Sequence, residues 1–384
     1  MGREFIFLPI FFAHNDLKKK PNTMAVHTPF NPRKRLLHAL AMGAQCGALC
    51  MGLMACTSTP PNTTGAAAAP QSAFVYSPYK HLAMALDPQA PIAATQVLGT
   101  RQPIATTPRP ALLPGATALT LAFAAGECGQ EHWGSLAGQA VADANIATLQ
   151  RAGLPYIIST GGEGNMFTCS SDAAMEQFVA RYASPQLVGF DFDIEAGQTP
   201  EMVRSLLRRI KAVQLRRPHL RLSFTVATLA ASDAGQASIN AQGQSVLAAI
   251  REAKLDNYFI NLMVMDFGPA QPANCVVRDG RCDMAASASR AVHNLHSRHG
   301  VPLAQIEVTA MLGINDVVEN IFTPEDATAL ARWVRQEKLG GLHFWSLDRD
   351  TPCPGGATVV SPSCSSLNAH PALAFSRAFA EGLR

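Results

Sequence analysis

The sequence predicts an α/β fold, a (β/α)8 TIM barrel that forms a single domain, and three observations support it. Eight apolar, strand-like runs follow one another along the chain from residue 74 onward. From the second run on, most gaps hold a helical pattern, and alternating strands and helices favour parallel strands with helices outside. The third observation is length, because the 311 residues from position 74 onward suit one barrel. An open doubly wound sheet is the alternative, but no Gly-rich dinucleotide fingerprint follows any run.

The eight runs give the expected strands in chain order. They span residues 74–79, 118–125, 156–162, 187–195, 220–228, 258–266, 306–312 and 342–347. The segment between the first two runs, roughly residues 80–114, is Pro-rich and weakly patterned. It receives no assignment.

Several of the intervening helices carry their own start signals. Thr199 followed by Pro200 supplies an N-cap and a first-turn proline. Thr323 and Pro324 repeat the pair, and Asp326 completes a capping box. Apolar residues at helical spacing mark three helices: Val203, Leu206, Leu207, Ile210 and Val213; Leu330, Trp333 and Val334; and Met175, Phe178, Val179 and Tyr182.

The run at residues 187–195 carries three carboxylates at every second position, Asp191, Asp193 and Glu195. Successive side chains of a strand point to opposite faces, so the three acids share one face and the apolar residues between them share the other. Buried carboxylates without partners cost several kcal/mol, so this row fits a polar cavity or a shared proton. An exposed acidic edge or a calcium site is the alternative. The apolar residues favour a covered strand and hence a catalytic site.

A barrel of this class would place the acid row at its functional end. Active sites of (β/α)8 barrels lie at the C-terminal ends of the strands. Glu195 is expected to be the last residue of its strand, at the mouth of the barrel. Asp193 and Asp191 would then lie successively deeper, each step covering about 6 to 7 Å. We expect all three acids to point toward the barrel axis.

Composition excludes two broad classes of protein. Charged residues make up 15% of the chain and hydrophobic ones 48%, which rules out a disordered chain or a nucleic-acid-binding polyelectrolyte. The formal charge of +3 comes from the first 55 residues, which hold seven Lys and Arg against two acids. The remainder holds 24 basic and 26 acidic residues and is therefore close to neutral. A neutral substrate fits this body better than a polyanion.

The N-terminal region is expected to be an export signal. Arg33, Lys34 and Arg35 precede an apolar run, residues 36–56, without any Lys, Arg, Asp or Glu. The tetrapeptide ending at Cys56 resembles a bacterial lipobox, so we expect a lipid at Cys56; a cleaved signal or an uncleaved anchor is the alternative. Met24 opens a more conventional leader than Met1.

The expected organisation therefore has three parts. Residues 1–55 are an upstream extension and signal peptide, residues 56–72 are a flexible tether, and residues 73–384 are the barrel domain. The expected location is a bacterial cell envelope, in the outer membrane or periplasm, or outside the cell.

Export agrees with the use of cysteine. Two of the nine cysteines fall in the leader and one is Cys56, which leaves six in the domain. Six cysteines can pair in fifteen ways. Short loops favour Cys275 with Cys282 and Cys353 with Cys364, which leaves Cys128 for Cys169, and an oxidising compartment would allow all three bonds. A metal cluster is the rival interpretation, but no C-x-x-C or His-rich spacing supports it.

Four sequence motifs resemble those of a known family. GFDFDIE resembles the D-x-x-D-x-D-x-E signature of family 18 glycoside hydrolases, the chitinases, with Val188 in place of the first acid. STGG, residues 159–162, resembles the S-x-G-G of the family's third strand. NLMVMDFG and FWSLDRD resemble its sixth and eighth strands, and the resemblance runs in order from about Phe74 to Cys364. It implies a catalytic TIM barrel that hydrolyses β-1,4-linked N-acetylglucosamine chains.

The resemblance also implies roles for the acid row. Glu195 would donate a proton to the glycosidic oxygen, and Asp193 would orient the 2-acetamido group of the substrate. Asp191 would share a proton with Asp193. Hydrolysis would be substrate-assisted and retaining, with the acetamido oxygen attacking the anomeric carbon. Neighbouring carboxylates raise the pKa of the member that holds a proton, as such chemistry requires.

Further substrate-binding residues follow from the same resemblance. They are Trp345 as the floor of the central sugar subsite, Met263, Met265 and Asp266 from the sixth strand, and Ser159, Gly161 and Gly162 from S-x-G-G. Met265 stands where the M-x-Y-D pattern has tyrosine, so a hydroxyl for the acetamido group is missing there. Core packing is the alternative for Trp345. A non-proline cis bond is expected between Trp345 and Ser346.

Other aromatic residues are more ambiguous. Trp133 and either Tyr76 or Tyr79 could line sugar subsites, although single aromatic residues are more often packing residues.

The resemblance implies no metal and no cofactor. The expected partner is a polysaccharide or oligosaccharide that contains N-acetylglucosamine, with no nucleic acid, with the membrane reached only through Cys56, and with the protein a monomer. Two alternatives keep the same barrel, an endo-β-N-acetylglucosaminidase acting on glycoprotein glycans and a non-catalytic sugar-binding protein. The intact acid row disfavours the non-catalytic protein, because a binding protein does not need a proton donor.

Overall fold

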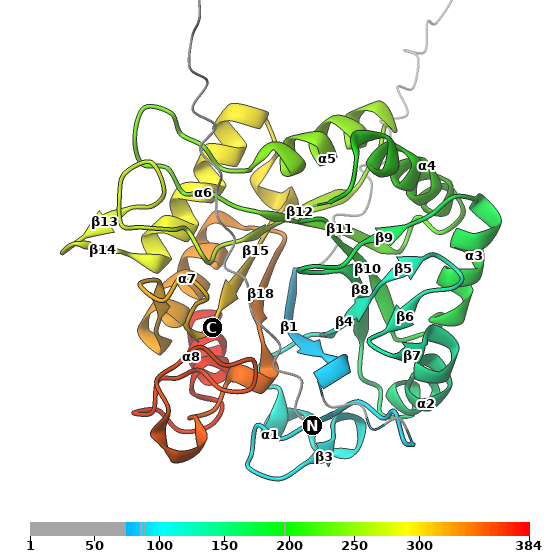
Figure 1. Cartoon of the computed structure of the whole chain (residues 1–384), viewed down its shortest axis with the longest axis horizontal. Helices are drawn as coiled ribbons and strands as arrows, with labels where there is room; N and C mark the ends of the chain where they lie inside the picture. Colours follow the sequence, from blue (N-terminus) through cyan, green and yellow to red (C-terminus); the bar gives the residue numbers. More distant parts are fainter. Residues whose placement is uncertain (1–73, 85–86, 88, 196) are drawn as a thin grey trace, which may run out of the picture. The chain divides into compact units, whose positions relative to one another are not determined.

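The computed structural model describes residues 74–384 apart from 85, 86, 88 and 196. The expected leader, the lipobox with Cys56 and the tether lie outside the described residues. The domain that follows is shown in Figure 1, where helices surround a central set of strands.

Eight parallel strands close into a barrel in the order β1, β18, β15, β12, β11, β10, β8, β4 (Figure 1). Their bounds are β1 (Val75–His81), β4 (Leu119–Ala124), β8 (Tyr156–Gly161), β10 (Leu187–Asp193), β11 (Arg221–Ala227), β12 (Tyr258–Met263), β15 (Ile306–Met311) and β18 (Gly341–Trp345). Each expected strand region contains or closely overlaps one of these strands. The predicted (β/α)8 fold is therefore confirmed.

One strand boundary differs from the expectation. β10 ends at Asp193, so Glu195 lies two residues beyond the strand and is not its last residue. Asp193 still pairs with Gly161 on β8 and Thr225 on β11. β8 ends at Gly161, where the backbone turns to φ +83°, so β10 has no partner on the β8 side beyond Asp193. Glu195 therefore belongs to the loop above the barrel.

The helices lie around the barrel and bury their apolar faces against it (Figure 1). They are α1 (Arg109–Leu112), α2 (Gly138–Arg151), α3 (Asp172–Arg181), α4 (Pro200–Arg216), α5 (Ala241–Glu252), α6 (Met284–His299), α7 (Pro324–Glu337) and α8 (Ala374–Gly382). The expected caps are confirmed: Thr199 accepts a bond from the backbone of Met202, and Thr323 and Asp326 form a reciprocal capping box.

The loops between the barrel strands and the helices contain short strands and 3-10 turns. The two-residue strands are β2 (Ala94–Thr95), β3 (Gln102–Pro103), β5 (Gly126–Glu127), β6 (His132–Trp133), β7 (Leu136–Ala137), β9 (Phe167–Thr168), β13 (Val277–Arg278), β14 (Arg281–Cys282), β16 (Gly313–Ile314) and β17 (Ile321–Phe322). The 3-10 turns are Leu82–Met84, Ile104–Thr106, Leu303–Gln305, Leu347–Arg349 and Pro354–Gly356. The unassigned segment 80–114 thus holds β2, β3, α1 and two of these turns.

Three disulfides close loops of the domain. They join Cys128 to Cys169, Cys275 to Cys282 and Cys353 to Cys364. The favoured pairing is therefore confirmed. The Cys128 bond connects the segment after β4 to the segment after β8, which lie side by side through the β5 and β9 pair.

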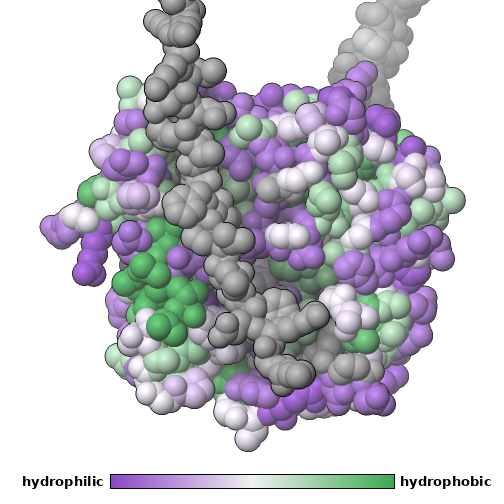
Figure 2. Space-filling view, in the orientation of Figure 1, coloured by the Kyte–Doolittle hydropathy of each residue, from purple (hydrophilic) through white to green (hydrophobic). Residues whose placement is uncertain are grey.

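The surface of the domain is mostly hydrophilic on the face shown in Figure 2, with one continuous apolar area at its lower left. Large apolar side chains that are strongly exposed include Leu215, Val318 and Val359. Every helix in the described ranges is too short or too polar to cross a bilayer.

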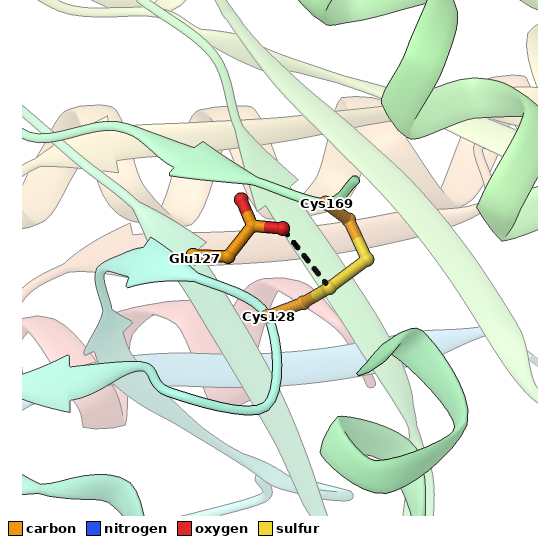
Figure 3. Close-up of side chains that lie close together, drawn as sticks. All are labelled: Glu127, Cys128 and Cys169. Atoms are coloured by element: carbon orange, nitrogen blue, oxygen red, sulfur yellow. Dashed lines mark hydrogen bonds between the residues drawn. A yellow bond between two sulfur atoms is a disulfide. The ribbon is translucent and has the colours of Figure 1, made fainter. Parts of the chain in front are cut away.

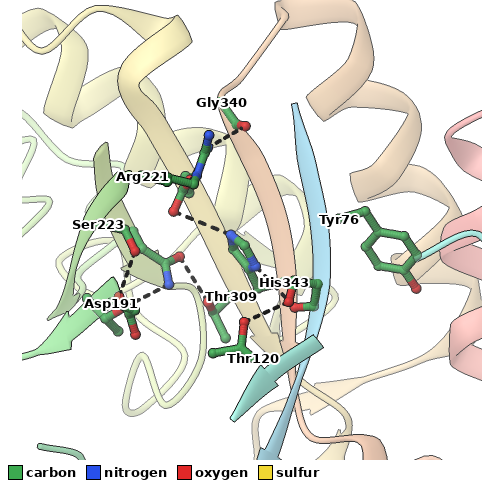
Figure 4. Close-up of polar contacts among 12 residues, drawn as sticks. Tyr76, Thr120, Asp191, Arg221, Ser223, Thr309, Gly340 and His343 are labelled. Atoms are coloured by element: carbon green, nitrogen blue, oxygen red, sulfur yellow. Dashed lines mark hydrogen bonds and ion pairs between the residues drawn. The ribbon is translucent and has the colours of Figure 1, made fainter. Parts of the chain in front are cut away.

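A buried ion pair closes the N-terminal end of the barrel (Figure 4). Arg221 donates from Nε to Glu307 Oε1 at 2.8 Å and from Nη2 to the carbonyl of Gly340 at 2.8 Å. The guanidinium also lies 3.5 Å from the ring centroid of Phe259. His343 Nε2 lies 3.4 Å from the other carboxylate oxygen of Glu307. Burial alone would raise the pKa of Glu307, but the Arg221 charge and these bonds lower it to about 2.

We expect Glu307→Gln to destabilise the domain by roughly 3–5 kcal/mol at neutral pH, because it removes the carboxylate charge to which the buried Arg221 guanidinium is bonded. The folded-state pKa of Glu307 is below its ordinary 4.5, so its stabilisation is complete above that value and is lost as the pH falls toward 2. The free energy of unfolding measured in urea should therefore be lower for the variant than for the wild type at neutral pH, and this difference should become smaller as the pH falls. Glu201→Gln is the control, because it breaks an ion pair with Arg204 on the surface of α4. It should change neither the free energy of unfolding nor its pH dependence measurably. A pH-independent difference for Glu307→Gln would contradict the expectation.

Candidate active site

Asp191 lies inside the barrel, where hydroxyl groups surround its carboxylate. Ser159 donates to Oδ2 at 2.6 Å and Tyr79 donates to the same atom at 2.9 Å. Ser223 and Thr225 donate to Oδ1 at 2.9 and 2.8 Å. Three other strands, β1, β8 and β11, supply these donors. Burial raises the pKa of Asp191, and the four hydrogen bonds oppose that shift by stabilising the charged form.

Asp193 lies two residues further along β10 than Asp191, and its carboxyl group has fewer hydrogen-bond donors. It is 6% exposed, and its Oδ1 has no hydrogen-bond partner among the described residues. Burial, followed by the charges of Glu195 and Asp191, raises its pKa well above the ordinary range. A proton held by this pair of aspartates is therefore favoured on Asp193 over Asp191.

Glu195 lies at the mouth of the barrel among other acids. Burial raises its pKa, and the charges of Glu163, Asp266 and Asp316 raise it further, to about 7. A carboxyl group with such a pKa is half protonated near neutral pH and can donate a proton there. The structure thus brings all three predicted catalytic acids to one interior region at the C-terminal ends of the strands.

Of the S-x-G-G residues predicted to bind substrate, Ser159 donates to Asp191, and Gly161 and Gly162 lie in close contact with neighbouring segments. A Cβ on Gly161 would lie 2.1 Å from the carbonyl oxygen of Asp193, and a Cβ on Gly162 would lie 2.6 Å from the ring of Phe123. Both have φ near +84°. These residues therefore allow the close approach of β8 to the acid row and of Phe123 to the loop.

Trp345 ends β18 and belongs to an aromatic group at the mouth. Its ring stacks with Phe123 at 5.5 Å between centroids, and His81 and Tyr79 pack at 5.5 and 6.1 Å. The indole is half-buried, so it is neither a core residue nor fully exposed. The bond between Trp345 and Ser346 is cis, as expected, and the bond before Phe123 is also cis.

The sixth-strand residues continue the inward face of β12. Asn261 contacts the hydroxyls of the interior, and Met263 shares its face by strand parity. Met265 lies two residues beyond the strand and is half-buried. Asp266 accepts a bond from the backbone of Val317 at 2.7 Å. Burial raises the pKa of Asp266 to about 6 despite that bond, with the Asp316 charge adding to the rise.

Arg349 anchors the loop that carries Asp316. The buried guanidinium donates to the carbonyls of Leu312 at 2.7 Å and Ile314 at 2.6 Å, and also to that of Ser361. Its charge faces Asp316 and Asp266. The loops after β12, β15 and β18 are therefore held together at the edge of the acidic mouth.

Figure 3 shows a group whose atoms could suggest a metal site, Glu127 with Cys128 and Cys169. The two sulfurs are joined in a disulfide, so no thiolate is present to bind a metal. The Glu127 carboxylate accepts bonds from the Thr168 hydroxyl and the Ser170 backbone, both at 2.6 Å. The group is accounted for as part of the loop structure.

Comparison with known proteins gives a consistent relationship, although no family model matches the chain. The probable bifunctional chitinase/lysozyme of Escherichia coli is 28% identical over 61% of this chain, and endochitinase 11 of Metarhizium anisopliae is 27% identical over 54%. The catalytic domain of a hyperthermophilic chitinase from Pyrococcus furiosus superposes with a TM-score of 0.60 at 26% identity, covering 81% of this chain and 95% of that one. The chain is therefore similar to chitinases, in agreement with the resemblance of its motifs to those of family 18 glycoside hydrolases. The chain spans only 27% and 42% of the length of the two curated relatives.

Several residues of this site were not predicted from the sequence. Ser223 and Thr225 alternate with apolar residues along β11, and that alternation was the available signal. Glu163 and Asp316 lie in loops and carry no comparable pattern. Their effect on Glu195 depends on how the loops meet.

The structure distinguishes the ambiguous aromatic residues clearly. Tyr79 faces the interior and donates to Asp191, whereas Tyr76 lies on the opposite face of β1 (Figure 4). Tyr76 packs against Phe344 and Phe379. Trp133 is buried and donates to the hydroxyl of Tyr182 at 2.8 Å. Tyr76 and Trp133 are therefore packing residues.

We expect Gly161→Ala to destabilise the domain strongly, because the new methyl group would meet backbone atoms of the acid strand. Gly164→Ala is the matched control, since Gly164 lies in the same loop with φ +70° but has open space at its Cβ position. Both variants incur a positive-φ cost of about 1 kcal/mol, and Gly161→Ala should lose roughly 1–3 kcal/mol more from overpacking. Chemical unfolding monitored by circular dichroism measures the difference. Equal losses for the two variants would show that the close approach is unimportant.

Proposed function

We propose that the protein is an exported hydrolase of β-1,4-linked N-acetylglucosamine chains, chitin or chito-oligosaccharides. The observation that carries the proposal is the geometry of the acid row: four hydroxyl groups surround Asp191, Asp193 is buried with an unpartnered oxygen, and Glu195 lies at the mouth with its pKa raised to about 7. A proton donor with a pKa of about 7, next to a neutral hydrogen-bonding carboxyl, suits glycosidic bond cleavage near neutral pH.

The proposed reaction has two balanced steps. In the first, Glu195 gives its proton to the glycosidic oxygen as the bond to the anomeric carbon breaks, and the substrate's acetamido oxygen forms a bond to that carbon. In the second, water attacks the anomeric carbon, gives a proton back to Glu195 and releases the acetamido oxygen. The configuration at the anomeric carbon is retained because it is inverted twice.

The other residues support this chemistry by position. Asp193 has an unpartnered oxygen that can accept the acetamido N–H and hold the group for attack. Trp345 offers an aromatic face to a sugar ring at the mouth. Met265 supplies no hydroxyl, so the acetamido group depends on the acid row for its polar contacts.

The substrate class is supported by related proteins. A second chitinase domain of Pyrococcus furiosus, 25% identical with a TM-score of 0.59, has been crystallised as catalytic site mutants complexed with chito-oligosaccharides. We extend that ligand class to this chain.

Export is supported by sequence and disulfides together. Three disulfides favour an oxidising compartment, and the basic and apolar leader favours secretion with a lipid at Cys56.

We expect Glu195→Gln to reduce turnover of chito-oligosaccharides at least ~10³-fold while sugar binding persists, since the amide keeps the shape but has no proton to donate. Product analysis on chito-oligosaccharides and on a glycoprotein, with protein starting at Thr57, separates this function from an endo-β-N-acetylglucosaminidase. Retention of most of the rate by the variant would overturn the assignment of Glu195. Cleavage of the glycoprotein alone would replace the proposed substrate.

We expect Glu163→Gln to move the basic limb of the kcat/KM pH profile to lower pH. Glu195 must be protonated to act, and the Glu163 charge is one of those that raise its pKa, so removing that charge makes Glu195 lose its proton earlier. Glu325→Gln removes an equal charge from the exposed start of α7 and should leave the limb in place. An unmoved limb in Glu163→Gln would contradict the electrostatic account of the mouth.

A further inference from the structure

Asn261 lies on β12 and reaches the hydroxyls around Asp191 from across the barrel interior. It is 1% exposed. Its Nδ2 donates to the Tyr79 hydroxyl at 3.0 Å and to the Thr225 hydroxyl at 2.8 Å. Its Oδ1 accepts a bond from the Thr309 hydroxyl at 2.9 Å. Every polar position of the amide facing this network is therefore used.

Counting protons fixes the direction of these bonds. Each hydroxyl has one proton, and the amide nitrogen of Asn261 has two. An ionised Asp191 carboxylate can only accept, so the Tyr79 and Thr225 hydroxyls each donate their single proton to it, and each accepts a bond from the Asn261 amide. The two groups lie 3.2 Å apart, so without the amide one could donate to the other and Asp191 would lose a donor.

Thr309 sets the orientation of the amide itself. Its hydroxyl donates to Oδ1, which turns Nδ2 toward Tyr79 and Thr225. The opposite orientation would present the amide oxygen to those two hydroxyls and compete with Asp191 for their protons. Figure 4 shows Thr309 in the interior on the strand beside this network.

We propose that Asn261 is a positioning residue whose amide aims the Tyr79 and Thr225 hydroxyls at Asp191, so that Asp191 stays charged and the proton of the pair stays on Asp193. A neutral Asp193 and a charged Asp191 keep the site ready to hold the acetamido group. The role in turnover rests on the proposed function, whereas the hydrogen-bond direction does not.

The other ionisable groups near Asp191 are limited in number. Tyr79 from β1 and Asp193 on its own strand face it directly, while β8 and β11 present the hydroxyls of Ser159, Ser223 and Thr225. Further toward the N-terminal end lie Arg221, Glu307 and His343, which bond to one another and to backbone carbonyls. The hydroxyls around Asp191 are therefore the direct means of stabilising its charge.

The principal test is Asn261→Leu, which keeps the approximate shape and removes both donors without adding a charge. The acidic limb of the kcat/KM profile on a soluble chito-oligosaccharide should rise by about 0.5–1 pH unit, because a less stabilised Asp191 takes up a proton earlier. The basic limb, set by Glu195, should stay in place. An equal loss of rate at every pH would show a merely structural role and overturn the proposal.

Two further variants keep the test decisive if Asn261→Leu does not fold. Thr309→Val retains the amide and removes the group that orients it, so the acidic limb should rise by a smaller amount. Thr120→Val is the matched control, since it removes a buried hydroxyl that bonds Ser77 at 2.7 Å in the same barrel and no hydroxyl of Asp191. The proposal would be contradicted if the acidic limb of the kcat/KM profile stayed in place in Thr309→Val, or if it rose by the same amount in Thr120→Val.

A thermodynamic cycle tests the network without activity. At neutral pH, Asn261→Leu should lower the folding equilibrium constant about tenfold more in the native background than in the Asp191→Asn background, where no charge needs the aimed hydroxyls. Thr309→Val in the same two backgrounds gives the same comparison with the amide retained. Equal changes in both backgrounds would overturn the proposal. Failure of the wild type to cleave any chito-oligosaccharide would instead remove the proposed function, and the cycle would still decide the direction of the bonds.

Discussion

The structure depends on supplying hydrogen-bond donors to one carboxyl group, that of Asp191, inside a closed sheet. Asp191 is removed from water, and only hydrogen-bond donors can replace the solvation it loses. No single neighbouring strand provides enough of them. Ser159 comes from β8, Ser223 and Thr225 come from β11, and the Tyr79 hydroxyl comes from β1, which does not pair with β10. Barrel closure is therefore what makes the charge tolerable, and the acid in turn requires the barrel to close in this register.

Burial raises the pKa of all three acids of the row, but the neighbours of each acid change that effect differently at each position. Asp191 has four donors, so its charge is compensated, whereas Asp193 has an unpartnered oxygen and two charged neighbours. Glu195 lies beyond the strand, and its pKa is raised mainly by burial and by the charges of acids in the loops. Three residues of similar chemistry thus differ in protonation because the number of donors falls and the number of nearby acids rises toward the mouth. This gradient separates a carboxyl group with four donors, one with an unpartnered oxygen and a proton donor along one strand and the loop that follows it.

The sequence predicted the parts of this arrangement that local periodicity controls. The alternation of acids with Phe190, Phe192 and Ile194 was enough to place Asp191 and Asp193 inside, and the helix caps and short-loop disulfides also follow from near neighbours. The end of β10 was not predictable, because it depends on where β8 turns at Gly161. Nor was Tyr79 predictable as a partner of Asp191, or Asn261 as a partner of Tyr79, since these contacts span 112 and 182 residues of sequence. Such contacts exist only once the barrel closes.

The acidity of Glu195 is consequently a property of the loops more than of its strand. Asp266 binds the backbone of Val317, which fixes the loop after β15 against the end of β12. Arg349 binds carbonyls of that same loop and of the segment after β18, and its charge partly offsets Asp316 and Asp266. Substitutions that loosen Arg349 would move acids relative to Glu195 without touching it, and would change its pKa through distance alone. A row of acids encoded by one strand and its following loop supplies the catalytic groups, and contacts of Arg349 and Asp266 hold in place the loops whose acids raise the pKa of Glu195.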